Sequence, residues 1–216
     1  FLGDVPLVSD IHFNYKFALQ AIEQGVDKVR LNPGNVGGLA GRFDDVGKER
    51  VKIVAEAAKN AGICMRVGVN SGSVEKDLLE KYGWATSDAI VDSALRHCEW
   101  LEKCGFRDVV VSLKSTNMEY VVESYRKFAA KTDYPLHVGV TEAGLPGYGT
   151  IKSAIGIGVL LLEGISDTIR VSLTGDKTLE MQAAYDILKA TGRRVREPEI
   201  IACPACGGSR STWRRS

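Results

Sequence analysis

A repeated alternation of short apolar runs and helical patterns constrains the fold of this sequence more than any other feature. Six runs rich in β-branched residues have the length of strands, at residues 7–11, 28–31, 63–69, 108–113, 136–140 and 168–173. The segments between them carry apolar residues three and four positions apart, as over residues 51–58, and Gly25, Gly62 and Gly105 stand where helix C-caps are expected. Repeated βα units form a parallel sheet with right-handed crossovers, so the pattern predicts an α/β protein, either a closed barrel or an open doubly wound sheet.

One face of every predicted strand becomes polar towards the carboxyl end of the strand. Side chains two residues apart share a face of a strand. The polar positions are Asp10 and His12, Arg30 and Asn32, Arg66 and Asn70, Ser112 and Lys114, His137 and Thr141 with the adjacent Glu142, and Arg170 and Ser172. Both faces of an open parallel sheet are covered and apolar, whereas a barrel places its site residues inside the carboxyl-end rim. The alternation therefore favours a TIM-type (β/α) barrel.

Four cations share this polar face, namely Arg30, Arg66, Lys114 and Arg170. Burying them together is costly unless an anion meets them. Arginine offers a planar fork that matches phosphate oxygens, and lysine offers a compact charge, so a diphosphate would engage several of them at once. The alternative interpretation is that each cation belongs to an ordinary ion pair with Asp10, Glu142 or a loop carboxylate. His12 and His137 are equally compatible with core and catalytic positions, and His97 is predicted to be structural.

The composition excludes some classes of partner. Lys and Arg number 28 against 27 Asp and Glu, for a net charge of +1, which indicates neither nucleic acid nor an anionic membrane surface as a partner. The longest apolar stretch, residues 155–162, is far shorter than the roughly 20 residues of a membrane helix, and no signal peptide is recognisable. We expect a soluble, cytoplasmic protein.

The five cysteines do not suggest a disulfide framework, because their number is odd and three lie within apolar patterns. Cys203 and Cys206 form a Cys-Pro-Ala-Cys motif, which most often holds zinc or an iron–sulfur cluster. The motif alone does not distinguish the two. Because the chain opens on Phe1 without an initiator Met and closes on a tail with neither structural period, we expect it to be a fragment.

Several of these segments together resemble one enzyme family. They are Asp10-Ile-His-Phe13, Val29-Arg-Leu-Asn-Pro-Gly-Asn35, Arg66-Val-Gly-Val-Asn-Ser-Gly-Ser73, Glu75-Lys-Asp77, Thr141-Glu-Ala-Gly144, Lys152-Ser-Ala-Ile-Gly156, Arg170-Val-Ser-Leu173 and Ala202-Cys-Pro-Ala-Cys206. The chain resembles the hydroxymethylbutenyl diphosphate synthases of the non-mevalonate isoprenoid pathway. This resemblance implies an eight-stranded barrel followed by a small domain that holds a 4Fe-4S cluster on three cysteines and a glutamate, in a homodimer. It also implies reductive ring opening of 2-C-methyl-D-erythritol 2,4-cyclodiphosphate, with electrons from ferredoxin or flavodoxin.

The resemblance also implies roles for individual residues. The residues expected to hold substrate are Arg30, Asn32, Arg66, Asn70, Lys114, Arg170 and Ser172, with Asp10 and His12 nearby. Glu142 matches the family's acid/base carboxylate, and Cys203 and Cys206 match the first two cluster ligands.

The chain also departs from the family pattern. About six of the eight strands are present, and the third cysteine and the glutamate ligand are absent after Cys206. We therefore expect a partial substrate-binding barrel over residues 1–200 and the truncated start of a cluster domain over residues 201–216, a chain unable to turn over alone.

Two other function classes remain open at this point. One is a metal-free barrel transferase acting on a diphosphate substrate, similar to dihydropteroate synthase, in which Cys203 and Cys206 have no function. The other is a scaffold that uses half a zinc knuckle for contacts and binds no phosphate ligand.

Overall fold

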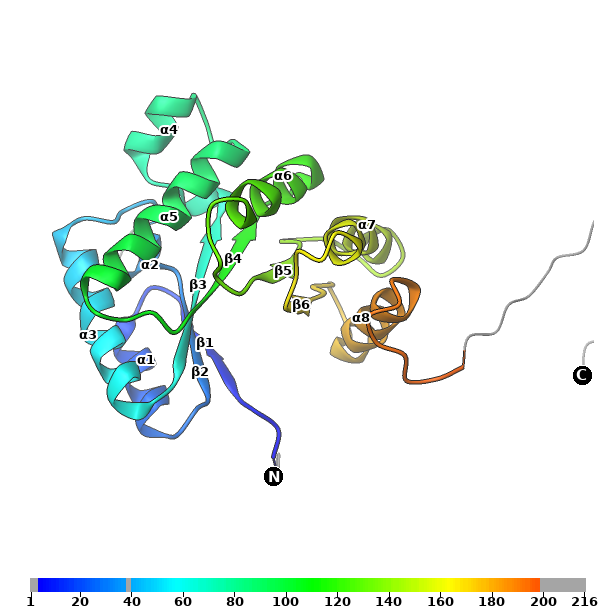
Figure 1. Ribbon diagram of the computed structural model, residues 1–216, viewed down its shortest axis with the longest axis horizontal. Helices are drawn as coiled ribbons and strands as arrows, with labels where there is room; N and C mark the ends of the chain where they lie inside the picture. Colours follow the sequence, from blue (N-terminus) through cyan, green and yellow to red (C-terminus); the bar gives the residue numbers. More distant parts are fainter. Residues whose placement is uncertain (1–3, 38–39, 199–216) are drawn as a thin grey trace, which may run out of the picture.

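Six parallel strands alternate with helices in the predicted order (Figure 1). The computed structural model describes residues 4–37 and 40–198. The strands are β1 (Val8–Asp10), β2 (Lys28–Leu31), β3 (Cys64–Asn70), β4 (Val109–Lys114), β5 (His137–Gly139) and β6 (Thr168–Arg170). The helices are α1 (Tyr15–Glu23), α2 (Pro33–Val36), α3 (Asp45–Ala61), α4 (Lys76–Tyr82), α5 (Ser87–Lys103), α6 (Met118–Ala129), α7 (Tyr148–Leu162) and α8 (Lys177–Ala190), with a 3-10 turn at Ser71–Ser73.

The strands follow one another across the sheet in chain order. β1, β2, β3 and β4 form one parallel sheet, β5 and β6 form a second, and a single parallel bridge between Val111 and Leu136 joins the two. A doubly wound sheet would reverse its strand order part-way, so sequential order is the arrangement of a TIM barrel. β1 and β6 do not pair with each other within residues 4–37 and 40–198. The alternation thus predicted the barrel-like architecture, and the described strands form an open arc.

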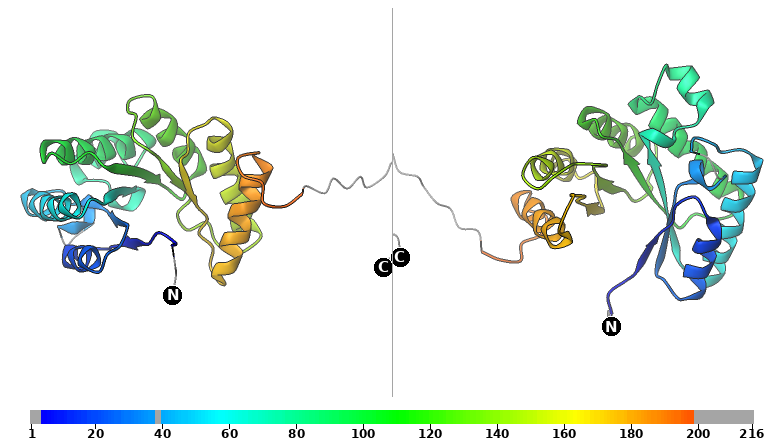
Figure 2. Two further views of the ribbon diagram at one scale, coloured as in Figure 1. Left: turned by 60° about the horizontal axis from the view of Figure 1, so that its bottom comes forward. Right: turned by 180° about the vertical axis from the view of Figure 1, so that it is seen from behind.

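The helices cover the outer side of this arc in each view (Figures 1 and 2). The strand faces predicted to be apolar lie against them, and Val29, Val67, Val111 and Val138 are fully buried. Helical residues at the predicted spacing complete this core, among them Tyr125 and Phe128 of α6. Each large side chain buried in this way contributes roughly 1.5–3 kcal/mol, so the outer layer fixes the strands whose other face forms the site.

A tyrosine hydroxyl occupies the seam between the two sheets. Tyr125 Oη accepts a hydrogen bond from the Leu113 N–H at 3.0 Å and donates one to the His137 carbonyl at 2.6 Å. It thereby satisfies one backbone group of β4 and one of β5 that do not pair with each other. Burial raises the pKa of the Tyr125 hydroxyl, so this group stays protonated and can keep both bonds. The hydroxyl therefore joins β4 to β5 where ladder hydrogen bonds are few.

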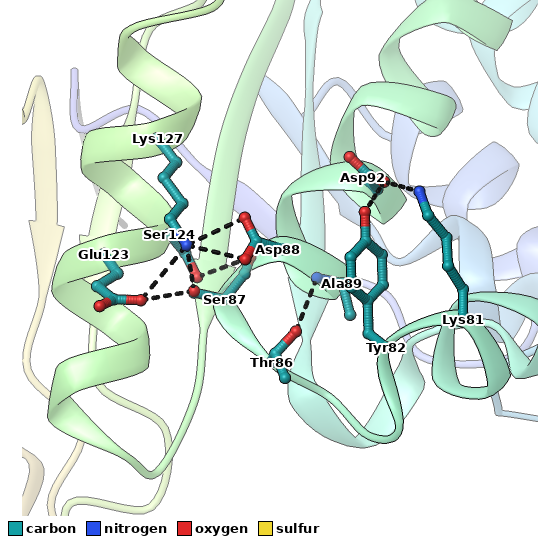
Figure 3. Close-up of polar contacts among 10 residues, drawn as sticks. All are labelled: Lys81, Tyr82, Thr86, Ser87, Asp88, Ala89, Asp92, Glu123, Ser124 and Lys127. Atoms are coloured by element: carbon teal, nitrogen blue, oxygen red, sulfur yellow. Dashed lines mark hydrogen bonds and ion pairs between the residues drawn. The ribbon is translucent and has the colours of Figure 1, made fainter.

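A polar cluster joins α5 to α6 (Figure 3). The Ser87 hydroxyl donates to Glu123 at 2.7 Å, and Lys127 Nζ donates to the Ser87 hydroxyl at 2.8 Å and to Asp88 at 3.0 Å. Thr86 caps the start of α5 by accepting from the Ala89 N–H at 3.2 Å. These bonds fix the amino end of α5 against α6.

Some local predictions differ from the structure. The sixth strand was expected over 168–173 but its ladder ends at Arg170, because β6 pairs with β5 alone among the described strands and β5 itself ends at Gly139. The run Asn32-Pro-Gly-Asn35 is typical of a tight turn, but in the structure it begins the one-turn helix α2. Asn32 caps this helix and Pro33, with its fixed φ, occupies the first helical position, which favours helix over turn.

Other local predictions are confirmed. Gly25, Gly62 and Gly105 end α1, α3 and α5 with positive φ, as their spacing indicated. No helix within the described residues is long and apolar enough to cross a membrane, and residues 155–162 lie within α7. The predicted boundary at residue 200, together with Cys203 and Cys206, lies outside the described residues and remains a prediction.

Candidate functional site

A polar cavity of about 350 Å³ opens at the carboxyl ends of the strands. This is the end at which TIM barrels carry their active sites. Eight of the predicted site residues line the cavity: Asp10, His12, Arg30, Asn70, Lys114, Glu142, Arg170 and Ser172. Residues that the polar alternation assigned to one face of each strand therefore lie around a single cavity, although their strands are far apart in the sequence.

The Asp10 carboxylate lies at the centre of the charged groups. Its Oδ1 is 2.9 Å from Arg30 Nη1, and its Oδ2 is 3.6 Å from Arg170 Nη1. The His12 ring nitrogen Nε2 lies 3.8 Å from Oδ1. Burial opposes ionisation of Asp10, but the attraction to Arg30 and the hydrogen bond from it outweigh burial, so the pKa of Asp10 lies below its usual range. One carboxylate thus links β1 to both β2 and β6.

Lys114 is the cation with the most strongly altered titration. Its side chain is mostly withdrawn from solvent, and the described residues place no carboxylate within 4.0 Å of its ammonium group. Burial is the largest of the causes that lower the pKa of Lys114 to about 7, and repulsion from Arg170, Arg66 and Arg30 lowers it further. Attraction to Asp10 raises the pKa, but by less than these effects lower it. The cavity therefore has an excess of positive charge that Asp10 does not neutralise.

Arg66 lies beneath the cavity and does not line it. It pairs in register with Arg30 on the neighbouring strand, is 8% exposed, and has an Nε with no hydrogen-bond partner among the described residues. Burial and the neighbouring arginines lower the pKa of Arg66, while Asp10 raises it. Arg66 therefore adds positive potential from below, and its predicted contact with substrate remains a prediction.

Asn32 is the predicted site residue with the clearest local role. Its side chain is 2% exposed, accepts a hydrogen bond from the Gly34 N–H at 3.1 Å and donates one to the Ser73 hydroxyl at 2.8 Å. Both of its polar groups are thus engaged in holding α2 against the turn after β3. Asn32 does not line the cavity, and its predicted contact with substrate remains a prediction.

Glu142 stands on the rim in a strained conformation. Its φ is +52°, a left-handed value that non-glycine residues seldom adopt and that costs of order 1–3 kcal/mol. The side chain is exposed and lines the same cavity as the cations. The Thr174 N–H donates to the Gly144 carbonyl at 2.9 Å, which ties the loop after β5 to the loop after β6. A carboxylate held at this rim can exchange a proton with a ligand below it.

His137 is buried beside the site, and its pKa lies far below neutral pH. Burial and the surrounding cations, above all Arg66 and Lys114, lower its pKa to about 2. Its Nδ1 lies 2.8 Å from the Thr168 hydroxyl, and it does not line the cavity. Of the two interpretations open for His137, the structure favours a neutral core residue. His97 is likewise fully buried, with its Nε2 2.7 Å from Glu75 Oε1, as expected of a structural histidine.

Comparison with known proteins identifies the family of this barrel. The model of the GcpE TIM-barrel domain matches residues 3–185, which is more than half of the chain. The chain belongs to the GcpE family. Two relatives, both named 4-hydroxy-3-methylbut-2-en-1-yl diphosphate synthase (flavodoxin), are 52% identical in Symbiobacterium thermophilum and 54% identical in Clostridium perfringens, each over 204 residues. These matches cover 94% of this GcpE chain but 53% and 56% of the relatives, so the chain spans about half of their length.

Solved structures resemble the GcpE barrel in fold alone. A type I 3-dehydroquinate dehydratase from Clostridium difficile is 12% identical with a TM-score of 0.52, over 88% of this chain and 71% of its own. A 2,3-dimethylmalate lyase is 11% identical with a TM-score of 0.54, over 86% of this chain and 64% of its own. Both likenesses agree with the barrel-like arrangement of the strands.

Further residues of the GcpE barrel line the cavity without having been predicted as site residues. They are Val140, Thr141, Gly144, Leu173 and Thr174. Thr141 was already among the polar strand-end positions, and Thr174 lies two residues beyond Ser172, so continuing the alternation past the strand end would have found it. The remaining three are apolar or glycine and carry no signal of their own in the sequence.

The described part of this GcpE chain does not fit an iron–sulfur cluster. Residues 4–37 and 40–198 contain no group of three His, Cys, Asp or Glu side chains that could hold a metal ion. Cys64, Cys98 and Cys104 are free, and burial raises the pKa of the Cys98 thiol to about 12, which disfavours its thiolate form. Cys203 and Cys206 lie outside the described residues, and their role as cluster ligands remains a prediction.

Proposed function

We propose that this chain is the substrate-binding barrel of a 4-hydroxy-3-methylbut-2-en-1-yl diphosphate synthase. In this function the complete protein reductively opens the ring of 2-C-methyl-D-erythritol 2,4-cyclodiphosphate, loses water and releases 4-hydroxy-3-methylbut-2-enyl diphosphate. The observation that carries the proposal is the excess of cations around one cavity, where Arg30, Lys114 and Arg170 stand against two carboxylates, Asp10 and Glu142. The names of the 52–54% identical relatives support the identity of the ligand.

The cations would bind the diphosphate group. Arg30 and Arg170 would turn one or both of their forks from Asp10 to the phosphate oxygens, and Lys114 would supply a point charge. Asn70 and Ser172 line the same cavity and offer hydrogen bonds that fix the orientation of the ligand. Charge and hydrogen bonding would thus both be directed at the polar end of the substrate.

Glu142 would act on the hydroxyl that leaves. Hydroxide is a poor leaving group until it is protonated, so a carboxyl group at the rim is placed to supply the proton. The strained turn that carries Glu142 follows β5, the strand next to β4 and Lys114, and Glu142 lines the same cavity as Lys114. We assign the general-acid role to Glu142 on this basis.

The reduction belongs to the part of the protein outside the described residues. A 4Fe-4S cluster would supply the electrons, with ferredoxin or flavodoxin as the donor and a homodimer as the assembly. Cys203 and Cys206 would be two of its ligands. Because the described residues offer no ligand set, no step of the reaction is assigned to the barrel beyond binding and proton transfer. A cytoplasmic location is part of the same proposal.

Calorimetric titration with the cyclic diphosphate tests the binding role. We expect Arg170→Met to weaken binding by about 10-fold to 100-fold, because a charge-assisted hydrogen bond contributes roughly 1.5–3 kcal/mol. The matched control is Arg126→Met, which removes an exposed arginine that pairs with Glu163 on the outer helices. Absence of binding to the wild-type chain at millimolar ligand, or equal affinities of the two variants, would reject the binding role.

Turnover requires a longer protein, such as a chimera in which residues 4–198 replace the matching part of the Clostridium perfringens relative. In this chimera Glu142→Gln should abolish turnover while the cyclic diphosphate still binds, because the amide cannot donate an acidic proton. Glu163→Gln, on the outer surface, is the control and should retain turnover. Unchanged turnover in Glu142→Gln removes the acid role.

A second chimera tests the two cysteines. It includes residues 199–206 and carries Cys203→Ser with Cys206→Ser, and we expect it to be inactive. Retained activity would favour a metal-free transferase.

A further inference from the structure

A buried glycine in β3 lies against the Nε and Nη2 edge of the Arg30 guanidinium. Gly68 is on the polar face of the strand, between Arg66 and Asn70. A β-carbon added at Gly68 would lie 2.6 Å from Arg30 Nε, 2.8 Å from its Nη2 and 3.1 Å from its Cζ. Real β-carbons do not approach other heavy atoms this closely, so any side chain at position 68 would displace the guanidinium.

The backbone does not require glycine at this position. Gly68 lies inside a regular parallel strand, and its φ is not in the left-handed region. Glycine inside a strand costs about 0.5–1 kcal/mol relative to alanine and typically marks a point of close approach. The group that makes the close approach here is the Arg30 side chain.

Gly139 in β5 provides a contrast. A β-carbon there would lie 2.8 Å from the Arg170 carbonyl oxygen, which is backbone, and 3.6 Å from Lys114 Cε. Gly139 is therefore required by the spacing between β5 and β6. At Gly68 the three nearest atoms all belong to the far end of one flexible side chain, so a substitution there can leave the sheet intact and move Arg30 alone.

The position of Arg30 depends on this recess. The Arg30 side chain is 6% exposed, and its Nη1 reaches Asp10 Oδ1 at 2.9 Å while the same residue lines the cavity. A guanidinium pushed away from β3 would lose this bond or enter the space where an anion would bind. We propose that Gly68 is a positioning residue for anion binding, because its missing side chain forms the recess that accommodates the Nε and Nη2 edge of the Arg30 guanidinium against β3, beside Asp10 and at the cavity wall. The role of Gly68 in anion binding rests on the function proposed above. Its role in placing the Arg30 side chain does not depend on that function.

A double-mutant cycle in the full chain tests this role, with inorganic pyrophosphate as the probe. Gly68→Ala should weaken pyrophosphate binding by about fivefold or more in the wild-type background. In the Arg30→Ala background, where the recess is empty, the same substitution should change the affinity by less than about twofold. The matched control is Gly72→Ala, whose added β-carbon meets nothing within 4 Å and should leave the affinity unchanged. An equal loss in both backgrounds, or no loss in either, overturns the proposal.

A second measurement does not depend on the ligand. The NMR titration of the Asp10 carboxyl group in the ligand-free protein should move upwards in Gly68→Ala, because Arg30 no longer holds the charged form. Gly72→Ala should leave it in place. If Asp10 shifts as expected but wild-type protein does not bind pyrophosphate, the proposed function fails and the role of Gly68 in placing Arg30 stands. An Asp10 titration that Gly68→Ala leaves unchanged overturns that role.

Folding is monitored by circular dichroism. If Gly68→Ala alone does not fold, the double variant with Arg30→Ala should fold, since the clash is with Arg30 only. If the Arg30→Ala variant folds but the double variant does not, the proposal is also overturned.

Discussion

Binding of the cyclic diphosphate is expected to take up a proton at Lys114. In the ligand-free protein burial, together with Arg170, Arg66 and Arg30, lowers the pKa of Lys114 to about 7. A diphosphate beside the ammonium group reverses the local field and restores a pKa near the ordinary value of 10.5. Lys114 therefore goes from partly neutral to fully charged when the anion binds.

The size of this effect follows from the shift. With a pKa of about 7, roughly half of the Lys114 groups are neutral at pH 7, about one tenth at pH 6 and about nine tenths at pH 8. Proton uptake should therefore rise from about 0.1 to about 0.9 per ligand between pH 6 and pH 8. Because only the charged form binds the anion well, the contribution of Lys114 to the affinity should fall about tenfold over the same range.

Calorimetry in buffers with different enthalpies of ionisation measures the proton count directly. The cyclic diphosphate suits this assay because each of its phosphates is doubly substituted and lacks the second ionisation that a phosphomonoester has near pH 6. Lys114→Met is the reference, since it keeps the length of the side chain and cannot take up a proton. We expect its proton count to be near zero and its affinity to be nearly independent of pH.

Equal proton uptake by the wild type and Lys114→Met, or wild-type affinity that does not fall between pH 6 and pH 8, would refute this reasoning. The same shift has a consequence for stability without ligand. Between about pH 7 and pH 10.5 the unfolded chain binds more protons at Lys114 than the folded chain does, so the contribution of this group to the free energy of unfolding rises with pH over that window.

Three further predictions concern the supports of the site. Tyr125→Phe should lower the free energy of unfolding by about 1–3 kcal/mol in urea titrations, because two buried backbone groups lose their partner; a change below about 0.5 kcal/mol would contradict the seam role. His97→Ala leaves the buried Glu75 carboxylate unpaired and should cost about 3–5 kcal/mol in the same assay, with much of this loss absent in the Glu75→Ala background. Asp10→Asn should lower the melting temperature of the ligand-free protein and enlarge the stabilisation by added pyrophosphate, whereas equal thermal shifts in both proteins would argue against a role as internal counterion. Since the pKa of Asp10 is lowered on folding, its stabilising contribution is present above the unfolded pKa and is lost as the pH falls through the folded value.

The sequence predicted the location of the site because strand periodicity is a local property. Side chains two residues apart must share a face, so Arg170 and Ser172 were assigned to one cavity wall without knowledge of their neighbours. Depth along the barrel axis is not local, since it depends on the register between strands. Arg66 is in register with Arg30 but does not line the cavity, because β3 continues four residues beyond it to Asn70 whereas β2 ends one residue beyond Arg30.

Other features depend on contacts between distant residues. The Asn32 side chain donates a hydrogen bond to Ser73, 41 residues later, and no sequence pattern near Asn32 predicts this partner. The apolar spacing within α6 is typical of a helix with Tyr125 on its buried face, but it does not indicate that the Tyr125 hydroxyl reaches two strands. The recess at Gly68 is equally invisible, because a glycine in a strand does not reveal which side chain lies over it.

The Asp10 carboxylate at the centre of the cavity also determines which classes of compound can bind this site as inhibitors. Asp10 is attached to the chain and faces Arg30 and Arg170 permanently, so an added ligand competes with a group whose effective concentration is very high. A neutral molecule or a single carboxylic acid would gain little by displacing it. Compounds that present two closely spaced negative charges, such as bisphosphonates, would engage Lys114 in addition to the arginines, and are therefore the chemical class with which to begin a search.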